Sequence, residues 1–449
     1  MATSQEIELI ARVGADTPMG NMLRRYWIPA MLCDELPEPD GAPKALRLLG
    51  EDLVAFRDTA GQVGIMDLAC PHRLASLALG RNEEGGIRCI YHGWKIDVNG
   101  KILDTPCELP GSRFKESFTH TAYPTREAAD LIWVYMGPKD KIPPFPEFNW
   151  MTIPSTHRSV GKIWEECNFI QSMEGVIDSF HTNLLHSGFE VLHWDKEQIA
   201  EVWKRPSRKS YGRIDYEPTD YGYHYAAVRE PTEDPEHYDY IRVTEYVAPF
   251  YCMNPPDLGA SSRPFIFVPI DDENTYLYEV TASEKGVVQG LSIRPGTPIA
   301  GGPVDHETHL KFSTMRLGED LYPDYKPKRN RSNNYGQDRE LMRRKEGRMS
   351  FSGIDAGIQT QDLGMIETMG KIGNRELEHL GASDLGIINF RKRLVDAVTS
   401  FVAGGEPPAL DPPVDYAKVR AVGAIIPKGD DWRPSAWTAG KTVSKATTS

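Results

Sequence analysis

Two cysteines and two histidines form two short pairs in the first quarter of the chain. Cys70 and His72 make the first pair, and Cys89 and His92 follow after sixteen intervening residues. Thiolate and imidazole both suit iron, and a 2Fe–2S cluster can be held by two cysteines on one iron and two histidines on the other. A zinc site is the alternative, but zinc fingers usually pair cysteine with cysteine and histidine with histidine. The mixed pairs therefore favour the cluster, and an assay for iron and acid-labile sulfide separates the two.

A second group of possible metal ligands lies in residues 165–190, which are predicted to be helical. Polar side chains recur there at steps of three or four residues, on one helical face: Asn168, Gln171, Glu174, Asp178 and His181. His186 follows, and a helix that loosens near Asn183 would let both imidazoles bind one metal ion. Two histidines and a carboxylate form the facial triad of mononuclear non-haem iron. For either histidine taken alone, an ordinary surface or core residue is the better interpretation.

The third ligand of such a triad must come from elsewhere in the chain. Asp355 and Asp362 lie seven residues apart and would share one face of a helix. An acidic residue at a helix start is also a common capping residue. The spacing alone does not choose between the two aspartates.

The elements that must position these residues fall into two kinds. Residues 40–138 contain short strand-like runs and turn residues, which predicts a small all-β domain. Five prolines between positions 138 and 154 predict a boundary. The following domain, 139–440, is predicted to be α+β with an antiparallel sheet and long helices. Its strand-like and helical runs are 221–228, 238–247, 264–281, 362–371 and 383–403.

Three further segments complete the predicted organisation. Residues 1–39 are predicted to be an N-terminal helical segment that packs on the second domain. The polar and basic residues 316–348 are expected to form a solvated loop. The small polar residues 441–449 are expected to be a flexible tail.

The composition excludes several classes of function. The chain has 449 residues and a net charge of −13, so a nucleic acid is not an expected partner. No apolar run approaches the length needed to span a membrane. The N-terminus lacks the features of a signal peptide, which points to the cytoplasm. Six cysteines in so long a chain do not indicate a disulfide scaffold.

A possible substrate surface lies on the strand-like run 238–247. Alternate residues of a strand share one face, and here they are Tyr240, Arg242, Thr244 and Tyr246. Aromatic side chains around one guanidinium suit an aromatic carboxylate. Arg205 and Arg208 are further candidates for contact with the substrate, although an arginine taken alone is more often a surface charge.

Both metal motifs together resemble the Rieske non-haem iron aromatic-ring-hydroxylating oxygenases, specifically their α subunit. The resemblance is closest to the phthalate dioxygenase-like branch, which also contains vanillate O-demethylase-type enzymes. It extends over about residues 5 to 400 and also rests on Thr-Pro-Met-Gly at 17–20, Arg-Arg-Tyr-Trp at 24–27 and Glu-His-Leu-Gly at 378–381. It implies an N-terminal all-β Rieske domain and a C-terminal helix-grip catalytic domain, together α+β.

The resemblance also assigns roles to the candidate residues. It implies that the cluster ligands are Cys70, His72, Cys89 and His92. It implies that His181 and His186 bind the mononuclear Fe(2+), and it favours Asp362 over Asp355 as the third ligand. Asp178 would accept a hydrogen bond from an iron histidine of its own chain and from His92 of a neighbouring subunit, within a homotrimer or a hexamer of two trimers.

The activity implied is O2-dependent cis-dihydroxylation of an aromatic carboxylate of the phthalate or isophthalate type. The alternative is a monooxygenase that removes an O-methyl group or hydroxylates a methyl group of a substituted benzoate. No Gly-x-Gly-x-x-Gly follows a strand, so electrons are expected from a separate NAD(P)H-linked reductase. A simple electron carrier is a weaker alternative, because a long chain with the His181 and His186 pair follows the cluster motif.

Overall fold

The computed structural model of the chain separates into two units. The small unit comprises Arg12–Pro146 and Val268–Asp272, and the large unit comprises Met1–Ala11, Glu147–Phe267 and Glu273–Ser449. The structure describes residues 3–186, 211–231, 234–255, 262–284, 315, 317–344, 351–355, 357–410 and 414–434.

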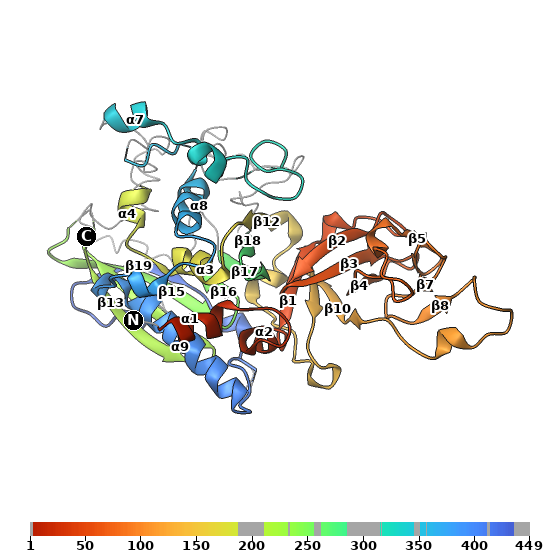
Figure 1. The fold of residues 1–449 in the computed structure, drawn as a ribbon. Coiled ribbons are helices and arrows are strands. Elements are labelled where there is room, and N and C mark those ends of the chain that lie inside the picture. Colours follow the sequence, from red (N-terminus) through yellow and green to blue (C-terminus); the bar gives the residue numbers. More distant parts are fainter. Residues whose placement is uncertain are drawn as a thin grey trace. The chain divides into compact units, whose positions relative to one another are not determined.

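The small unit is built from antiparallel strands, as predicted (Figure 1). One sheet has the order β2 (Lys44–Leu48), β3 (Glu51–Arg57), β4 (Val63–Asp67) and β9 (Ala122–Tyr123). A second has the order β5 (Arg81–Glu83), β6 (Gly86–Arg88), β7 (Lys95–Ile96) and β8 (Ile102–Asp104). The turn between β7 and β8 contains Asn99 and Gly100, whose φ of 83° suits glycine.

A third sheet of the small unit contains a strand from the N-terminal part of the chain. Its order is β1 (Trp27–Leu32), β11 (Leu131–Tyr135) and β10 (Thr125–Ala128). Because β1 pairs with β11, residues 12–39 group with the strands, whereas the sequence placed all of 1–39 on the second domain. Helix α2 (Pro18–Leu23) precedes β1 and is capped by Thr17, whose hydroxyl accepts the Gly20 N–H at 3.1 Å.

The large unit is organised around one antiparallel sheet, which confirms the predicted fold class. The strand order is β12 (Arg158–Glu165), β18 (Asn274–Ala282), β17 (Pro264–Asp271), β16 (Tyr251–Met253), β15 (Tyr238–Val247), β14 (Gly222–Arg229) and β13 (Arg213–Thr219), and β19 (Val422–Pro427) also pairs with β15. Aromatic cross-strand pairs support it; Tyr223 on β14 lies opposite Tyr246 on β15, with ring centroids 5.3 Å apart.

In the described part of the large unit the helices are α1 (Ser4–Ala11), α3 (Phe169–Ile177), α4 (Thr182–Leu185), α7 (Arg339–Arg344), α8 (Ile358–Thr368) and α9 (Leu385–Val402). Helices α3 and α9 lie against the sheet, whereas α7 lies away from it (Figure 1). Helix α3 packs against β16, β18 and α8, and α9 packs against β13. Helix α9 buries Phe390, Leu394 and Val398, one residue per turn, and it ends before Gly404, as the sequence predicted. No helix in the described part of the chain is both long and apolar enough to cross a membrane.

The continuous helix predicted over 165–190 is wrong. Helix α3 ends at Ile177, and Asp178 has an extended backbone with ψ of 118°. The Asp178 carboxylate accepts the backbone N–H groups of Phe180 at 2.7 Å and His181 at 3.4 Å. Such a side-chain turn competes with the helical hydrogen bonds, so the chain breaks before His181 and not near Asn183.

The polar segment 316–348 is only partly the solvated loop that was expected. It contains a short 3-10 helix, Arg331–Gly336, and helix α7. Tyr335 is buried, and its hydroxyl donates to Glu367 of α8 at 2.8 Å. This aromatic anchor holds part of the segment against the large unit.

Candidate metal centres and a lined cavity

The loops that carry the first candidate ligands have the same backbone turn. The N–H of Leu74 donates to the carbonyl of Cys70 at 2.8 Å, and that of Gly93 donates to Cys89 at 2.9 Å. Leu74 and Gly93, each four residues after a cysteine, both have positive φ, at 61° and 75°. The two loops therefore bend back in matching ways and present their side chains to one place.

The four side chains of these loops fit a 2Fe–2S cluster. Cys70 and Cys89 are buried, and the ring centroids of His72 and His92 lie 4.4 Å apart. Burial, with Cys89 adjacent, raises the pKa of Cys70 to about 11, so a thiolate there needs a cation. Among the residues that the structure describes, the buried Nδ1 of His72 has no hydrogen-bond partner. A buried ring nitrogen in that state is suited to a metal ligand.

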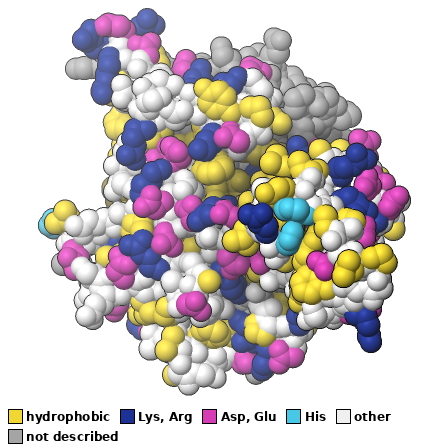
Figure 2. Space-filling model, turned by 45° about the vertical axis from the view of Figure 1, so that its right-hand side comes forward, with side chains coloured by type: hydrophobic (Ala, Val, Ile, Leu, Met, Phe, Trp, Pro, Cys, Tyr) yellow, Lys and Arg dark blue, Asp and Glu magenta, His cyan; other side chains and the backbone are white. Residues whose placement is uncertain are grey.

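The surface beside these loops is apolar and basic. Figure 2 shows histidine at the surface of one face, among hydrophobic side chains and next to a basic one. Exposed hydrophobic residues of the two loops are Leu74, Leu79, Ile90 and Tyr91. The Arg73 guanidinium lies 5.6 Å from the centroid of the Tyr91 ring. His72 and His92 are both half-buried, so the pair is partly exposed at the surface of the small unit.

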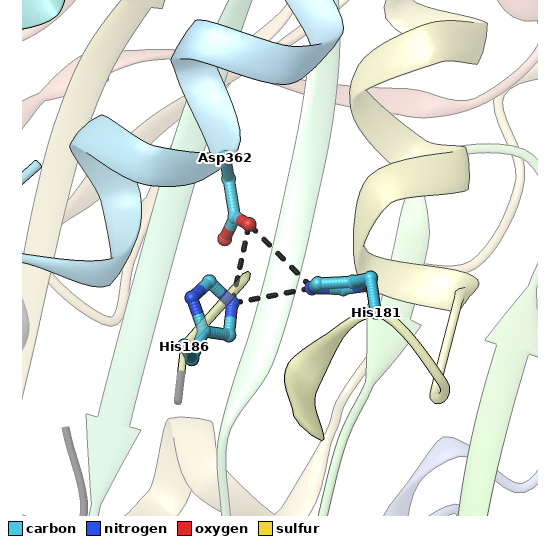
Figure 3. A group of neighbouring side chains, drawn as sticks. All are labelled: His181, His186 and Asp362. Atoms are coloured by element: carbon cyan, nitrogen blue, oxygen red, sulfur yellow. Dashed lines mark hydrogen bonds and ion pairs between the residues drawn. The ribbon is translucent and has the colours of Figure 1, made fainter. Parts of the chain in front are cut away.

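The second candidate centre brings together His181, His186 and Asp362, which point toward one another (Figure 3). The Nε2 atoms of the two histidines are 3.2 Å apart. Oδ1 of Asp362 lies 3.2 Å from Nε2 of His186 and 3.5 Å from Nε2 of His181. Two nitrogens and one oxygen converging in this way fit a facial triad for one iron. Asp355 is exposed and takes no part in this group.

Charges around the triad favour a cation. Burial alone would lower the pKa of His181, but hydrogen bonds to Asp178 and Asp362 outweigh it and raise this pKa to about 9. Burial would raise the pKa of Asp362, but the charges of His186 and His181 hold it well below its usual value. The site therefore stabilises positive charge between its ligands.

Each histidine is held from behind by a second polar group. Nδ1 of His181 lies 3.5 Å from Oδ2 of Asp178. Nδ1 of His186 lies 2.7 Å from Oε1 of Gln361, which is fully buried and donates to Ser352 at 2.8 Å. Such contacts fix the ring tautomer and direct Nε2 to the metal. No pattern in the sequence predicts this role of Gln361, for which adjacency to Asp362 is the only signal.

A cavity of about 200 Å³ opens beside the triad and is lined in part by it. Its apolar wall includes Val176, Phe265, Phe267, Leu277, Ile358 and Ile366. Tyr240 and Arg242 line it, as predicted, but Thr244 and Tyr246 do not. Tyr246 packs against Phe390 of α9 instead, with ring centroids 5.0 Å apart.

Two arginines of the cavity lie close together. Arg242 donates to the Ser179 hydroxyl at 2.6 Å, and Arg229 donates to the Ser179 carbonyl. Burial and the charge of Arg242 lower the pKa of Arg229 to about 10. Within the described residues, neither guanidinium has a carboxylate partner. Arg229 is buried and Arg242 is half-buried. Because a buried charge without a counter-ion is costly, the pair is suited to bind an anionic ligand.

The structure brings Arg242 to the cavity, whereas Arg205 and Arg208 lie outside the described residues. Arg229, the last residue of β14, also lines the cavity and was not predicted from the sequence. Its register opposite Tyr240 is the signal that could have found it, but that register depends on which strands are neighbours.

Comparisons with known proteins match the chain to proteins with a Rieske 2Fe–2S domain. The profile of the family described as "Rieske [2Fe-2S] domain" matches residues 26–119, and that described as "LigXa C-terminal domain like" matches residues 134–447. The chain is 41% identical to the phthalate 4,5-dioxygenase oxygenase subunit of Pseudomonas putida over 435 residues, 96% of this chain and 94% of that protein. It is 37% identical to the 3-chlorobenzoate-3,4-dioxygenase oxygenase subunit of Comamonas testosteroni, covering 96% and 97% of the two chains.

Solved structures show the same fold at low sequence identity. NdmA of Pseudomonas putida CBB5, as a mutant with theobromine, superposes with a TM-score of 0.55 at 17% identity, covering 91% of this chain and 98% of that one. Dicamba monooxygenase superposes with a TM-score of 0.54 at 15% identity, covering 86% and 99%.

Proposed function

The chain belongs to the Rieske non-haem iron aromatic-ring-hydroxylating oxygenases, as an oxygenase subunit of the phthalate dioxygenase-like branch, and from this premise we propose that it cis-dihydroxylates an aromatic carboxylate. Its cofactors are those of the family, a Rieske 2Fe–2S cluster and a mononuclear iron. When bound, the cluster supplies electrons and the mononuclear iron activates dioxygen. The match to the Rieske profile favours the cluster over a zinc site, and the long second domain argues against a simple electron carrier.

The arginine pair is the single observation that carries the proposed substrate class. Arg229 and Arg242 can bind a carboxylate through several charge-assisted hydrogen bonds. Phe265 and Phe267 lie on the same face of β17 and line the cavity, where they suit the face or edge of an aromatic ring. The names of both relatives, phthalate and 3-chlorobenzoate dioxygenases, agree with an aromatic acid. Phthalate and isophthalate remain the first substrates to test.

This chain's own residues have positioning roles in the proposed reaction. The arginines orient the substrate beside the triad, and holding a reactant in place can supply a large part of a rate enhancement. Asp178 and Gln361 orient the imidazoles of His181 and His186. The exposed loop surface around Arg73 and Tyr91 suits electron exchange with a separate reductase. A homotrimer, or a hexamer of two trimers, stays a prediction that sedimentation can check.

Replacement of Arg242 tests the substrate class directly. Arg242→Gln is expected to raise the KM for phthalate or benzoate roughly 10- to 100-fold, because a hydrogen bond to a charged group contributes about 1.5–3 kcal/mol. Steady-state oxygen uptake measures it. Arg213→Gln, which changes an exposed arginine of β13, is the matched control and should leave KM unaltered. An unaltered KM in Arg205→Ala, Arg208→Ala and Arg242→Gln alike would refute an arginine-anchored carboxylate.

Asp178 is proposed as a positioning residue, which would accept hydrogen bonds from His181 of its own chain and from His92 of a neighbouring subunit. Asp178→Asn keeps an oxygen acceptor for the turn but removes the negative charge beside His181. We expect kcat to fall about 10- to 100-fold, while iron content and the visible spectrum of the cluster stay normal. Near-normal turnover in this variant would exclude the role.

O-demethylation or methyl hydroxylation is the second candidate function. The chain is 28% identical to the 5,5'-dehydrodivanillate O-demethylase oxygenase subunit of a Sphingobium strain over 429 residues. The products separate the two reactions. A cis-dihydrodiol retains both atoms of isotopically labelled dioxygen, whereas O-demethylation of a methoxybenzoate releases formaldehyde.

A further inference from the structure

The cavity contains acidic groups as well as the arginine pair. Glu165 and Glu279 both line it and are only 3% and 4% exposed. The Ser172 hydroxyl donates to Glu165, and the side-chain nitrogen of Gln359 lies 3.5 Å from Oε1 of Glu279. Two nearly buried carboxyl groups in a binding cavity require an explanation, because burying them is costly.

The strand order places the acids and the arginines on different sides of the cavity. Glu165 and Glu279 come from β12 and β18, which are neighbours at one side of the sheet. Arg242 and Arg229 come from β15 and β14, beyond β17 and β16. Neighbouring strands are about 4.8 Å apart, so β18 and β15 are separated by roughly 14 Å. The two phenylalanines of β17 lie between an acidic wall and a basic wall.

A third cation, Arg263, lies just before β17. Its guanidinium is 5.1 Å from the centroid of the Phe265 ring, so it covers an edge of the aromatic wall. Three kinds of group therefore follow one another across the sheet from β12 to β14. The carboxyl groups come first, then the aromatic rings of β17 with the guanidinium of Arg263, and then the two neighbouring guanidinium groups. A bound aromatic acid would span this sequence of groups.

We propose that Glu165 and Glu279 select the substituent that lies across the ring from the anchoring carboxylate. They accept a hydrogen-bond donor there, such as a hydroxyl or amino group, and exclude a second carboxylate. This inference rests on the proposed function, because it assumes that the arginine pair holds the first carboxylate. Two adjacent carboxylates, as in phthalate, would both lie at the arginines and would not be excluded.

The electrostatics of Glu165 support this selection. Burial is the main cause that raises the pKa of Glu165 to about 8, and the negative charges of Glu367 and Glu279 act in the same direction. Surroundings that disfavour the ionised form of a resident carboxyl group also disfavour an incoming carboxylate. A hydroxyl or amino group carries no negative charge and can donate a hydrogen bond to a carboxyl oxygen.

Equilibrium binding to the purified, iron-loaded enzyme without reductase tests the inference. Calorimetry would compare phthalate, terephthalate, benzoate and 4-aminobenzoate. We expect terephthalate to bind at least about tenfold more weakly than phthalate, because like charges brought together cost several kcal/mol, and 4-aminobenzoate to bind more tightly than benzoate. Glu279→Gln and Glu165→Gln should each reduce the ratio of the terephthalate Kd to the phthalate Kd, by about tenfold together.

Matched variants make the result decisive. Glu166→Gln changes the neighbouring, partly exposed acid, which does not line the cavity, and should leave the ratio unaltered. Gln359→Glu adds a charge beside Glu279 and should raise the ratio, which provides a test if Glu279→Gln fails to fold. If Arg205→Ala, Arg208→Ala and Arg242→Gln all leave benzoate binding intact, the proposed function fails. If Arg242→Gln weakens every acid but none of the Glu165, Glu279 and Gln359 variants moves the ratio, this inference alone is overturned.

Discussion

Asp362→Ala is expected to remove the mononuclear iron and reduce oxygenation to background, while the two irons of the 2Fe–2S cluster remain. The reason is geometric: Oδ1 of Asp362 lies 3.2 Å and 3.5 Å from the Nε2 atoms of His186 and His181. It is the only anionic group of the triad, and two imidazoles without it bind Fe(2+) weakly. The small unit carries its own cluster ligands, so the cluster is unaffected by a change in the large unit.

Iron analysis and the visible spectrum of the same sample measure this result. Asp355→Ala is the matched control, because Asp355 is exposed and lies seven residues earlier; it should keep all irons and normal turnover. An Asp362→Ala enzyme that still turns over, or that loses the cluster together with the mononuclear iron, would contradict the proposed ligand set.

Arg391→Leu is expected to destabilise the large unit by about 3 to 5 kcal/mol. Arg391 on α9 binds both oxygens of Glu174 on α3, at 2.6 Å and 3.0 Å, and Glu174 also pairs with Arg375 at 2.7 Å. These three side chains are at most 8% exposed, so removing one partner leaves a poorly compensated buried charge. Because the Asp178 N–H donates to the Glu174 carbonyl, the same network anchors the end of α3 that leads to His181.

Urea unfolding, monitored by circular dichroism, measures this loss of stability. Lys392→Ala is the control on the next residue: Lys392 forms an exposed ion pair with Asp396, and such a pair contributes less than about 1 kcal/mol. The free energy of unfolding of Arg391→Lys should lie between those of Arg391→Leu and Lys392→Ala, because an ammonium group cannot replace a bidentate guanidinium. Equal stability of Arg391→Leu and Lys392→Ala would show that the buried network does not stabilise the unit.

The metal motifs were predictable because their ligands are close together in the chain. Cys70 with His72 and Cys89 with His92 form two short loops, so local backbone turns suffice to aim them. The same holds for His181 and His186, five residues apart. The helix break before His181 was missed, since helical spacing of polar residues does not reveal that the Asp178 side chain captures the backbone N–H groups of its own turn.

Local alternation on one strand identified Arg242, but no local pattern identified Arg229, Glu165 or Glu279. These residues come from β14, β12 and β18, and their meeting around one cavity depends on the strand order. Family resemblance favours Asp362 over Asp355 as the third ligand. In the structure Asp362 lies beside His181 and His186, on helix α8, which packs against α3.

Residue types and short spacings by themselves determined that this chain has two iron motifs, an all-β part and an α+β part. Only the tertiary structure decided which charges surround the substrate cavity. The physical reason is sequence separation. A few backbone torsions determine how two ligands within five residues are placed, whereas the pairing of strands far apart in the sequence determines which side chains form a cavity wall. That pairing results from cooperative burial of the whole sheet and cannot be assigned to any single segment.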